Sequence, residues 1–209
     1  MRRILIADDH SVVRKGLKQI LQDEFPSAFI AEVADAEELL KKIMMEEWDI
    51  VITDISMPGR SGLDVLNQIR QSHPKLPFLI LSMYPEDQYA IRVLKAGASG
   101  YLNKDSAPEE LVKAVNRVLL GKKYITPSIA EKLVTTFDHN AGELIHECLS
   151  DREFEVLKLL ASGKSVSDIS EQISLSVSTI STYRARIMTK MNLKTNADLT
   201  LYSIDHKLI

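Results

Sequence analysis

Three acidic residues, a serine and a lysine each lie at the end of a short apolar run in the first half of the chain. They are Asp8, Asp9, Asp54, Ser82 and Lys104. Three carboxylates brought close together would repel one another and raise each other's pKa values, unless a hard divalent cation lay among them. Mg²⁺ fits this set because it prefers oxygen ligands and commonly bridges carboxylates to a phosphoryl group.

Asp54 is the best placed of these residues to accept a phosphoryl group. A carboxylate can act as the nucleophile and form an aspartyl phosphate. The metal and Lys104 would neutralise the charge on the transferring oxygens, and Ser82 could hydrogen-bond the attached group. The alternative is that the acids are loop residues or helix caps, for which Asp is a preferred type. Their recurrence at successive strand ends favours the site.

The elements that would hold these residues alternate along positions 1–120. Short apolar runs are separated by stretches with 3.6-residue periodicity, which predicts five strands and five helices. Continuous apolar strands indicate burial on both faces, so we expect an α/β doubly wound five-stranded parallel sheet, in which ligands bind beyond the carboxyl ends of the strands. The expected strands are Ile4–Ala7, Phe29–Ala31, Ile50–Ile52, Phe78–Leu81 and Gly100–Leu102.

Helix starts support this count. Asp35, Ser61 and Ser106 each precede an acidic residue by three positions, which is the spacing of a capping box. No glycine-rich nucleotide motif follows any of the strands. The phosphoryl group should therefore come from another molecule.

Residues 121–148 break the alternation and are predicted to be a linker with one helix. Pro127 opens the helix, which should run to about Phe137, and a loop follows. His139 and His146 have no metal-ligand partners at useful spacing. We assign them no chemistry.

Residues 149–209 show only helical signals and predict a small all-α domain. Ser150 and Ser165 each begin a capping box, with helices to about Ser162 and Ile173. A tight turn through Ser174–Ser176 then leads into a third helix with apolar residues on one face. Helix, short turn and helix is the arrangement that places its second helix in a DNA major groove.

The third helix combines small polar side chains with basic ones. Four basic residues and no acidic one lie between Ser181 and Lys194, although the whole chain has a net charge of −3. Such a surface can approach a groove closely and bind phosphates, whereas the alternative is an ordinary solvated helix face. The candidate DNA contacts are Ser178, Thr179, Ser181, Thr182, Arg184, Ala185, Arg186 and Lys190.

Residues 1–120 resemble the receiver domain of bacterial response regulators. The acidic pair, Asp54 followed by Met57-Pro58-Gly59, Ser82, Tyr101 and Lys104 carry the resemblance. It implies that Asp9, Asp54 and the carbonyl of Ser56 ligate Mg²⁺, with Asp8 acting largely through water. It also implies that Ser82 and Tyr101 form a switch pair, in which the hydroxyl moves to the phosphoryl group and the ring turns inward. Many receivers have proline after the lysine, where this chain has Asp105.

The last 60 residues resemble the LuxR-type helix-turn-helix of the NarL/FixJ response regulators. The resemblance rests on Leu149-Ser150-x-Arg152-Glu153, Gly163-Lys164-Ser165, Ile169-Ser170-Glu171, Thr179-Ile180-Ser181-x-Tyr183 and Lys190-Met191. Common members have Lys and His where this chain has Ser181 and Tyr183, so no family sequence preference is transferred. In that family the unphosphorylated receiver often covers the recognition helix.

Cysteine usage and hydropathy indicate a cytoplasmic protein. The single cysteine, Cys148, has no intrachain partner, which fits a reducing compartment. The longest uncharged run is far shorter than the ~20 apolar residues that a membrane span needs. No targeting signal is evident either.

The sequence as a whole predicts a two-component response regulator rather than an enzyme. A sensor histidine kinase, or a small acyl phosphate, would phosphorylate Asp54, and the change at Ser82 and Tyr101 would alter domain docking or dimerisation. A homodimer would then bind double-stranded promoter DNA. Two alternatives are a regulator that binds DNA regardless of phosphorylation and an aspartyl-phosphate phosphatase. Such phosphatases usually carry a second acid two residues after the nucleophile, where Ser56 stands here.

Overall fold

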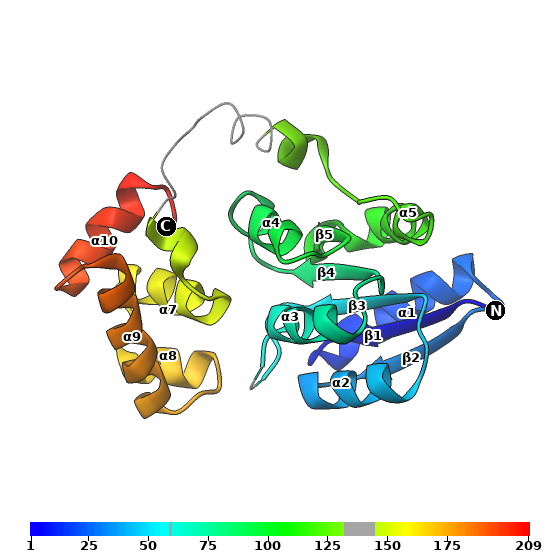
Figure 1. Ribbon diagram of the computed structural model, residues 1–209, viewed down its shortest axis with the longest axis horizontal. Coiled ribbons are helices and arrows are strands. Elements are labelled where there is room, and N and C mark those ends of the chain that lie inside the picture. The colour runs from blue at the N-terminus through cyan, green and yellow to red at the C-terminus, as the bar shows by residue number, and fades with distance from the viewer. Residues whose placement is uncertain (59, 132–144) are drawn as a thin grey trace. The chain divides into compact units, whose positions relative to one another are not determined.

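The computed structural model describes residues 1–58, 60–131 and 145–209 (Figure 1). The chain divides into two compact units, Met1–Asp138 and His139–Ile209, each of which is described by itself. Among the described residues, no helix is both long and apolar enough to cross a membrane.

The N-terminal unit alternates strands and helices along its whole length. Its strands are β1 (Arg3–Ala7), β2 (Phe29–Val33), β3 (Ile50–Asp54), β4 (Phe78–Ser82) and β5 (Gly100–Asn103). Its helices are α1 (Ser11–Glu24), α2 (Ala36–Met45), α3 (Gly62–Ser72), α4 (Glu86–Lys95), the 3₁₀ turn η1 (Lys104–Ser106) and α5 (Ala107–Leu119). The five predicted strands are confirmed. The first four helices each follow a strand and a loop, whereas the turn η1 lies between β5 and the fifth helix, α5.

The strands form one parallel sheet in the order β2-β1-β3-β4-β5. The order reverses beside β1, because β2 lies on one side of it and β3 on the other. In this topology the loops after β1 and β3 open on the same edge of the sheet, which is where ligands bind in doubly wound folds. The predicted fold class of the first domain is therefore confirmed.

The sheet is buried because helices pack on it. The side chains of Ile4, Ile6, Ile50 and Ile52 form a core with apolar residues of α1 and α5, including Leu21, Leu111 and Val115, and all are at most 1% exposed. The helices α2 and α3 pack side by side. Both faces of β3 and β4 are buried throughout, which explains why these strands are continuously apolar.

Two of the three predicted helix caps of this unit are confirmed, and the third is wrong. Asp35 accepts the amide hydrogen of Glu38, and Ser61 forms a full capping box with Asp64. Ser106 makes no side-chain cap, because its backbone already lies in the helical region after the turn η1. Its hydroxyl donates to the carbonyl of Asn103 instead.

The C-terminal unit is helical, as predicted. It contains η2 (Ile145–Cys148), α7 (Asp151–Ala161), α8 (Val166–Gln172), α9 (Val177–Met191) and α10 (Asn196–Asp205). Capping boxes begin α7 at Ser150 and α8 at Ser165. A residue with positive φ, Ser174, makes the tight turn before Ser176 caps α9. In the linker, a helix begins at Pro127 and is described to Glu131; its predicted continuation to Phe137 lies outside the described residues.

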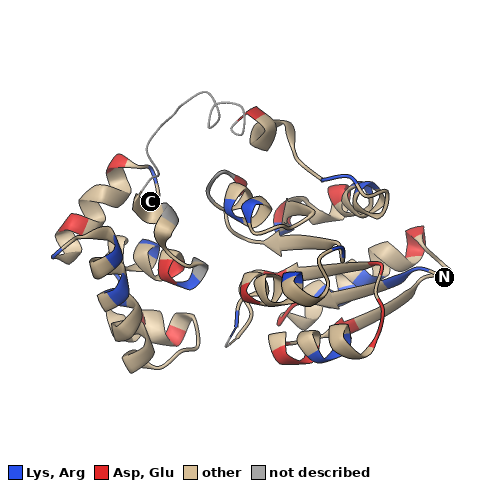
Figure 2. Cartoon of the chain, in the orientation of Figure 1, with Lys and Arg blue, Asp and Glu red and all other residues tan. Residues whose placement is uncertain are grey.

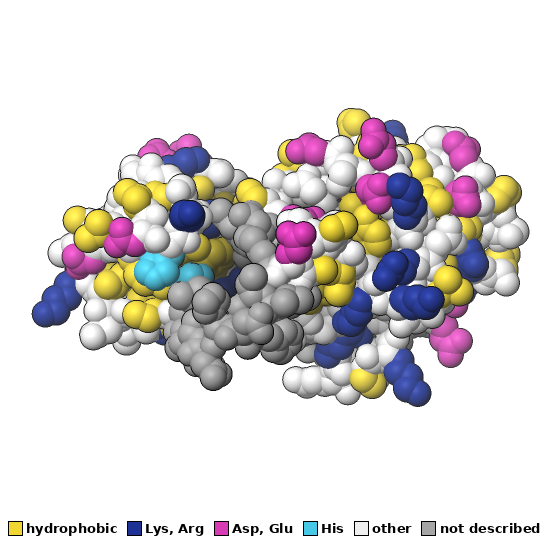
Figure 3. All heavy atoms as spheres, turned by 90° about the horizontal axis from the view of Figure 1, so that it is seen from above, with side chains coloured by type: hydrophobic (Ala, Val, Ile, Leu, Met, Phe, Trp, Pro, Cys, Tyr) yellow, Lys and Arg dark blue, Asp and Glu magenta, His cyan; other side chains and the backbone are white. Residues whose placement is uncertain are grey.

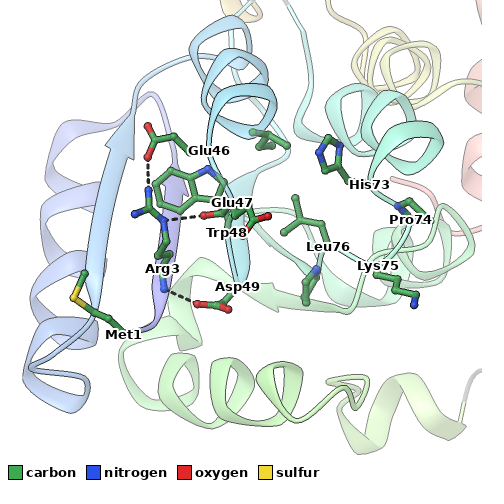
Figure 4. Close-up of a pocket in the computed structure, with 12 residues that line it drawn as sticks. Met1, Arg3, Glu46, Glu47, Trp48, Asp49, His73, Pro74, Lys75 and Leu76 are labelled. Carbon is green, nitrogen blue, oxygen red and sulfur yellow. Dashed lines mark hydrogen bonds and ion pairs between the residues drawn. The ribbon is translucent and has the colours of Figure 1, made fainter.

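A cavity of about 710 Å³ lies at the sheet edge where the strands begin (Figure 4). Its lining includes Arg3, whose guanidinium lies 4.9 Å from the ring of Trp48 and donates to the carbonyl of Glu47. The backbone amide of Arg3 donates to Asp49 at 2.6 Å. These contacts join Arg3 to the residues that precede β3, on the edge opposite Asp8 and Asp54.

Gly62 allows α3 to begin close to the end of β3. Its amide donates to the carbonyl of Ile55 at 2.9 Å, and a Cβ atom at this position would lie 2.1 Å from the carbonyl oxygen of Asp54. The backbone oxygen cannot turn away as a flexible side chain could. The loop that follows Asp54 therefore requires glycine here.

We expect Gly62→Ala to lower the free energy of unfolding by about 1–3 kcal/mol, because the methyl group overpacks a closed site. Gly16→Ala is the matched control: Gly16 lies within α1 with open space around it, and alanine there should raise the stability by about 0.5–1 kcal/mol. Urea unfolding of both variants measures the difference. Equal effects would contradict the packing account.

Candidate functional site

The acidic residues predicted to share a site meet at the carboxyl edge of the sheet. Asp8 follows β1 and is fully buried, and Asp54 ends β3 and is 2% exposed. Asp9 lies between Asp8 and the start of α1, with its side chain partly exposed. One carboxylate oxygen from each, together with a ring nitrogen of His10, fall within 4.8 Å of one another. The structure therefore assembles the three carboxylates that the sequence singled out.

Lys104 provides the positive charge of this pocket. Its ammonium lies 2.6 Å from Oδ2 of Asp54 and 2.7 Å from Oδ2 of Asp8, and its side chain is 7% exposed. The turn η1 directly after β5 places it there. One ammonium thus holds two buried carboxylates whose mutual repulsion would otherwise oppose folding.

Burial and charge act in opposite directions on the pKa values of this pair. Burial raises the pKa of Asp54, and the nearby Lys104 reverses only part of that rise, so the pKa stays above its ordinary value. Burial would lower the pKa of Lys104, but the carboxylates of Asp54 and Asp8 outweigh it and raise that pKa. Lys104 therefore stays protonated, whereas ionising the carboxyl group of Asp54 costs electrostatic free energy.

The remaining oxygen of Asp54 faces its own loop. The backbone amide of Ser56 donates to Oδ1 of Asp54 at 3.2 Å. The backbone amide of His10 donates in the same way to Oδ1 of Asp8 at 2.8 Å. The acids are thus oriented by backbone groups and by one lysine.

The other two residues of the predicted site, Ser82 and Tyr101, meet at a single residue of the β4–α4 loop. The amide of Tyr84 donates to Oγ of Ser82 at 3.0 Å, and the carbonyl of Tyr84 accepts the hydroxyl of Tyr101 at 2.6 Å. Asn103 also donates to that carbonyl. Tyr101 is fully buried, so its ring lies inside the fold rather than at the surface.

In the C-terminal unit, α9 buries Ile180, Ile187 and Met191 and presents its other face to solvent. Among the eight predicted contact residues, Thr179 and Arg184 are half-buried and the others are exposed. Basic residues recur along α9 (Figure 2). The hydroxyls of Ser181 and Thr182 donate to carbonyls one turn back in the helix, which leaves their oxygens as acceptors at the surface.

The basic side chains of α9 differ in how far they are engaged within the unit. Lys190 pairs with Glu153 of the α7 capping box at 2.7 Å, and Arg184 donates to Asn196 at the start of α10. Arg186 makes no hydrogen bond or ion pair within the part of the chain that the structure describes. Arg186 is therefore the basic side chain most available to an external anion.

His146 is a packing residue. Its ring stacks on Phe154, and its Nδ1 lies 2.9 Å from the hydroxyl of Tyr202 on α10. The ring of His206 stacks on Tyr202 at 4.0 Å between centroids. Histidine side chains lie among hydrophobic ones on the surface of this unit (Figure 3). His139, the other histidine of the predicted linker, lies outside the described residues.

Comparison with known protein families identifies the family that combines such an acidic pocket with such a helical unit. Residues 4–116 match the response regulator receiver domain, and residues 147–203 match the LuxR family of bacterial regulatory proteins. The chain belongs to the NarL/FixJ family of response regulators. This is a family of DNA-binding transcription regulators rather than of enzymes, and the acidic pocket described above is its phosphorylation site.

Known response regulators are similar to this one over nearly their full length. The oxygen regulatory protein NreC of Staphylococcus carnosus is 38% identical, with 99% of each chain covered. The response regulator UvrY of Escherichia coli K12 is 34% identical, covering 100% of this chain and 96% of that protein. RcsB of Salmonella enterica serovar Typhimurium, solved bound to a promoter in the presence of the phosphomimetic BeF₃⁻, is 28% identical with a TM-score of 0.58, covering 96% and 97%.

Two residues of this response regulator emerged only from the structure. His10 contributes to the acidic cluster, and its position directly after the acidic pair was the available signal. Tyr84 acts through its backbone, which no side-chain pattern reveals. The partnership of Lys190 with Glu153 was also missed, because the two residues are 37 positions apart.

We expect Asp54→Asn to raise the melting temperature of the receiver domain by a few degrees at pH 7 in EDTA. Folding raises the pKa of Asp54, so the protonated carboxyl favours the folded state at low pH. This contribution is lost as the pH rises through the raised pKa. At neutral pH the ionised carboxylate therefore lowers the free energy of unfolding. Calorimetry measures the transition. Asp23→Asn, which changes an exposed carboxylate of α1, should leave it unchanged, and a lower melting temperature for Asp54→Asn would refute the argument.

Proposed function

We propose that Asp54 accepts a phosphoryl group from a sensor histidine kinase or a small acyl phosphate, and that this controls dimerisation and promoter binding. A carboxylate oxygen of Asp54 forms the new bond to phosphorus. The bond from phosphorus to the kinase histidine nitrogen, or to the acyl oxygen, breaks with its electron pair going to the leaving group. The observation that carries this proposal is the buried ion pair between Asp54 and Lys104 at the edge where ligands bind.

The donor set fits Mg²⁺, which would screen the charge between the incoming phosphoryl group and the carboxylates. The three carboxylates supply oxygen ligands within reach of one ion. Oδ1 of Asp9 is buried and accepts no hydrogen bond from the described residues, although Nδ1 of His10 lies 2.8 Å away, so it keeps lone pairs for a metal ion. Asp9, Asp54 and the carbonyl of Ser56 would hold the ion, with Asp8 acting mostly through water.

Lys104 would exchange one partner for another as Asp54 is modified. Its ammonium already lies against the oxygen of Asp54 and keeps its charge through the raised pKa. Once that oxygen becomes part of an acyl phosphate, the ammonium can pair with the phosphoryl oxygens. Asp8 holds Lys104 in place during the exchange.

The signal would leave the pocket through Tyr84. A phosphoryl group that attracts the hydroxyl of Ser82 removes the acceptor of the Tyr84 amide, while the carbonyl of the same residue holds Tyr101. The two switch residues are thus coupled through one peptide segment. Its displacement would change the α4–β5 surface and with it dimerisation or domain docking.

The helix α9 would contact double-stranded DNA through the eight residues named above, and two copies would bind as a homodimer. Residues 150–209 hold eight basic and seven acidic residues, so one copy should bind weakly alone, while phosphate contacts add when two copies share a duplex. RcsB has been solved as two dimers bound to two parallel DNAs. We place the protein in the cytoplasm, in keeping with its exposed free thiol at Cys148.

Acetyl phosphate with Mg²⁺ tests the proposal directly. We expect a mass increase of one phosphoryl group, faster sedimentation and tighter promoter binding on the same sample, all abolished by EDTA or by Asp54→Asn. Asp64→Asn, which changes a carboxylate of α3 that caps its helix, serves as the matched control and should keep all three responses. A modified Asp54 without any change in sedimentation or binding would overturn the gating step.

A second candidate function, DNA binding regardless of phosphorylation, is favoured by one observation. Tyr101 already lies inward with its hydroxyl on Tyr84, which is the ring position that the family associates with the phosphorylated form. An Asp54→Asn protein with wild-type promoter affinity and wild-type oligomeric state would support this candidate.

We expect Arg186→Ala to weaken DNA binding on every sequence and to reduce the slope of log K against log salt by about one per subunit, because one phosphate contact is lost. Titrations at several salt concentrations measure the slope. Lys41→Ala, which removes an exposed charge on α2, should leave it unchanged. An unaltered slope for Arg186→Ala would show that this side chain does not contact phosphate.

A further inference from the structure

His10 brings a nitrogen donor to a pocket whose other donors are oxygens. It occupies the residue before α1, and its side chain makes no capping hydrogen bond to that helix. Its Nδ1 lies 2.8 Å from Oδ1 of Asp9 and 3.3 Å from Oδ1 of Asp8. The imidazole is 66% exposed, so it faces the acids while keeping room to rotate.

The geometry places this nitrogen within reach of an ion held by the carboxylates. One ligand atom each from Asp8, Asp9, His10 and Asp54 lie within 4.8 Å of one another. In an octahedron with bonds of about 2.1 Å, opposite ligands lie about 4.2 Å apart. Shifts of a few tenths of an ångström would therefore bring the atoms of Asp9, His10 and Asp54 around one ion, with that of Asp8 near enough to act through water, and rotation of the exposed imidazole can supply much of that shift.

We propose that this receiver binds divalent first-row transition-metal ions in its acidic pocket, with an imidazole nitrogen of His10 as a ligand. This inference rests on the proposed metal site and adds a preference for particular ions at that site. Mg²⁺ gains little from a nitrogen donor because it prefers oxygen, whereas imidazole suits ions such as Ni²⁺ and Zn²⁺. His10 thus shifts the preference of the pocket from Mg²⁺ toward these ions.

A purely structural role for His10 makes a different prediction. If the imidazole only hydrogen-bonds Asp9, an asparagine amide can replace it, and the affinity for all ions would change together. Asparagine also keeps the start of α1, because it is a preferred residue before a helix. His10→Asn therefore separates the loss of a nitrogen ligand from damage to the pocket.

Calorimetric titration of the tag-free full chain with Ni²⁺ and with Mg²⁺ tests the proposal. We expect the Kd for Ni²⁺ to rise at least about tenfold in His10→Asn, in line with the loss of one metal-binding group, and the Kd for Mg²⁺ to change less than about twofold. His73→Asn is the matched control, since His73 follows α3 at the opposite edge of the sheet. It should bind both ions as the wild type does.

Pulsed electron paramagnetic resonance on the Mn²⁺-loaded protein adds a direct readout. We expect nitrogen modulation from the imidazole in the wild type and in His73→Asn, and none in His10→Asn. An unchanged Kd for Ni²⁺ in His10→Asn, or wild-type spectra without nitrogen modulation, would overturn the inference while leaving the Mg²⁺ site intact. A wild-type protein that binds neither Mg²⁺ nor Ni²⁺ would overturn the metal site itself and the inference with it.

Discussion

The ammonium of Lys104 between two buried carboxylates is the interaction on which the receiver depends. Asp8 and Asp54 are almost inaccessible to water, and without a shared cation their charges would destabilise the fold. The arrangement also leaves Asp54 with a raised pKa, so the pocket stores electrostatic free energy at the residue that we propose as the phosphoryl acceptor. Structure and reactivity therefore have a common origin in one buried cluster.

The fold supplies the positions from which these three charges meet. Asp8, Asp54 and Lys104 lie at the carboxyl ends of β1, β3 and β5, and these ends share an edge only because the sheet is parallel and ordered β2-β1-β3-β4-β5. Gly62 then lets α3 begin against the backbone of Asp54. A change in either the strand order or this close approach would separate groups that must lie within hydrogen-bonding distance.

Much of this arrangement could be predicted from the sequence, because local patterns determine it. The apolar runs predicted all five strands, and Asp54 and Lys104 could be placed on one edge by topology alone. Ser106 has the sequence spacing of a helix cap but not the extended backbone conformation that a cap needs, because the turn η1 before it already brings the chain into the helical region. The roles of Tyr84 and the partner of Lys190 depend on backbone hydrogen bonds and on contacts between distant residues, which no local pattern encodes.

The ion pair between Lys190 and Glu153 joins α9 to α7 within the C-terminal unit. Glu153 also closes the α7 capping box, so a single carboxylate anchors the base of one helix and the start of another. A duplex phosphate that drew Lys190 away would remove one partner of Glu153 and leave its hydrogen bond from the Ser150 amide in place. Any contact of Lys190 with DNA would therefore compete with an ion pair inside its own unit.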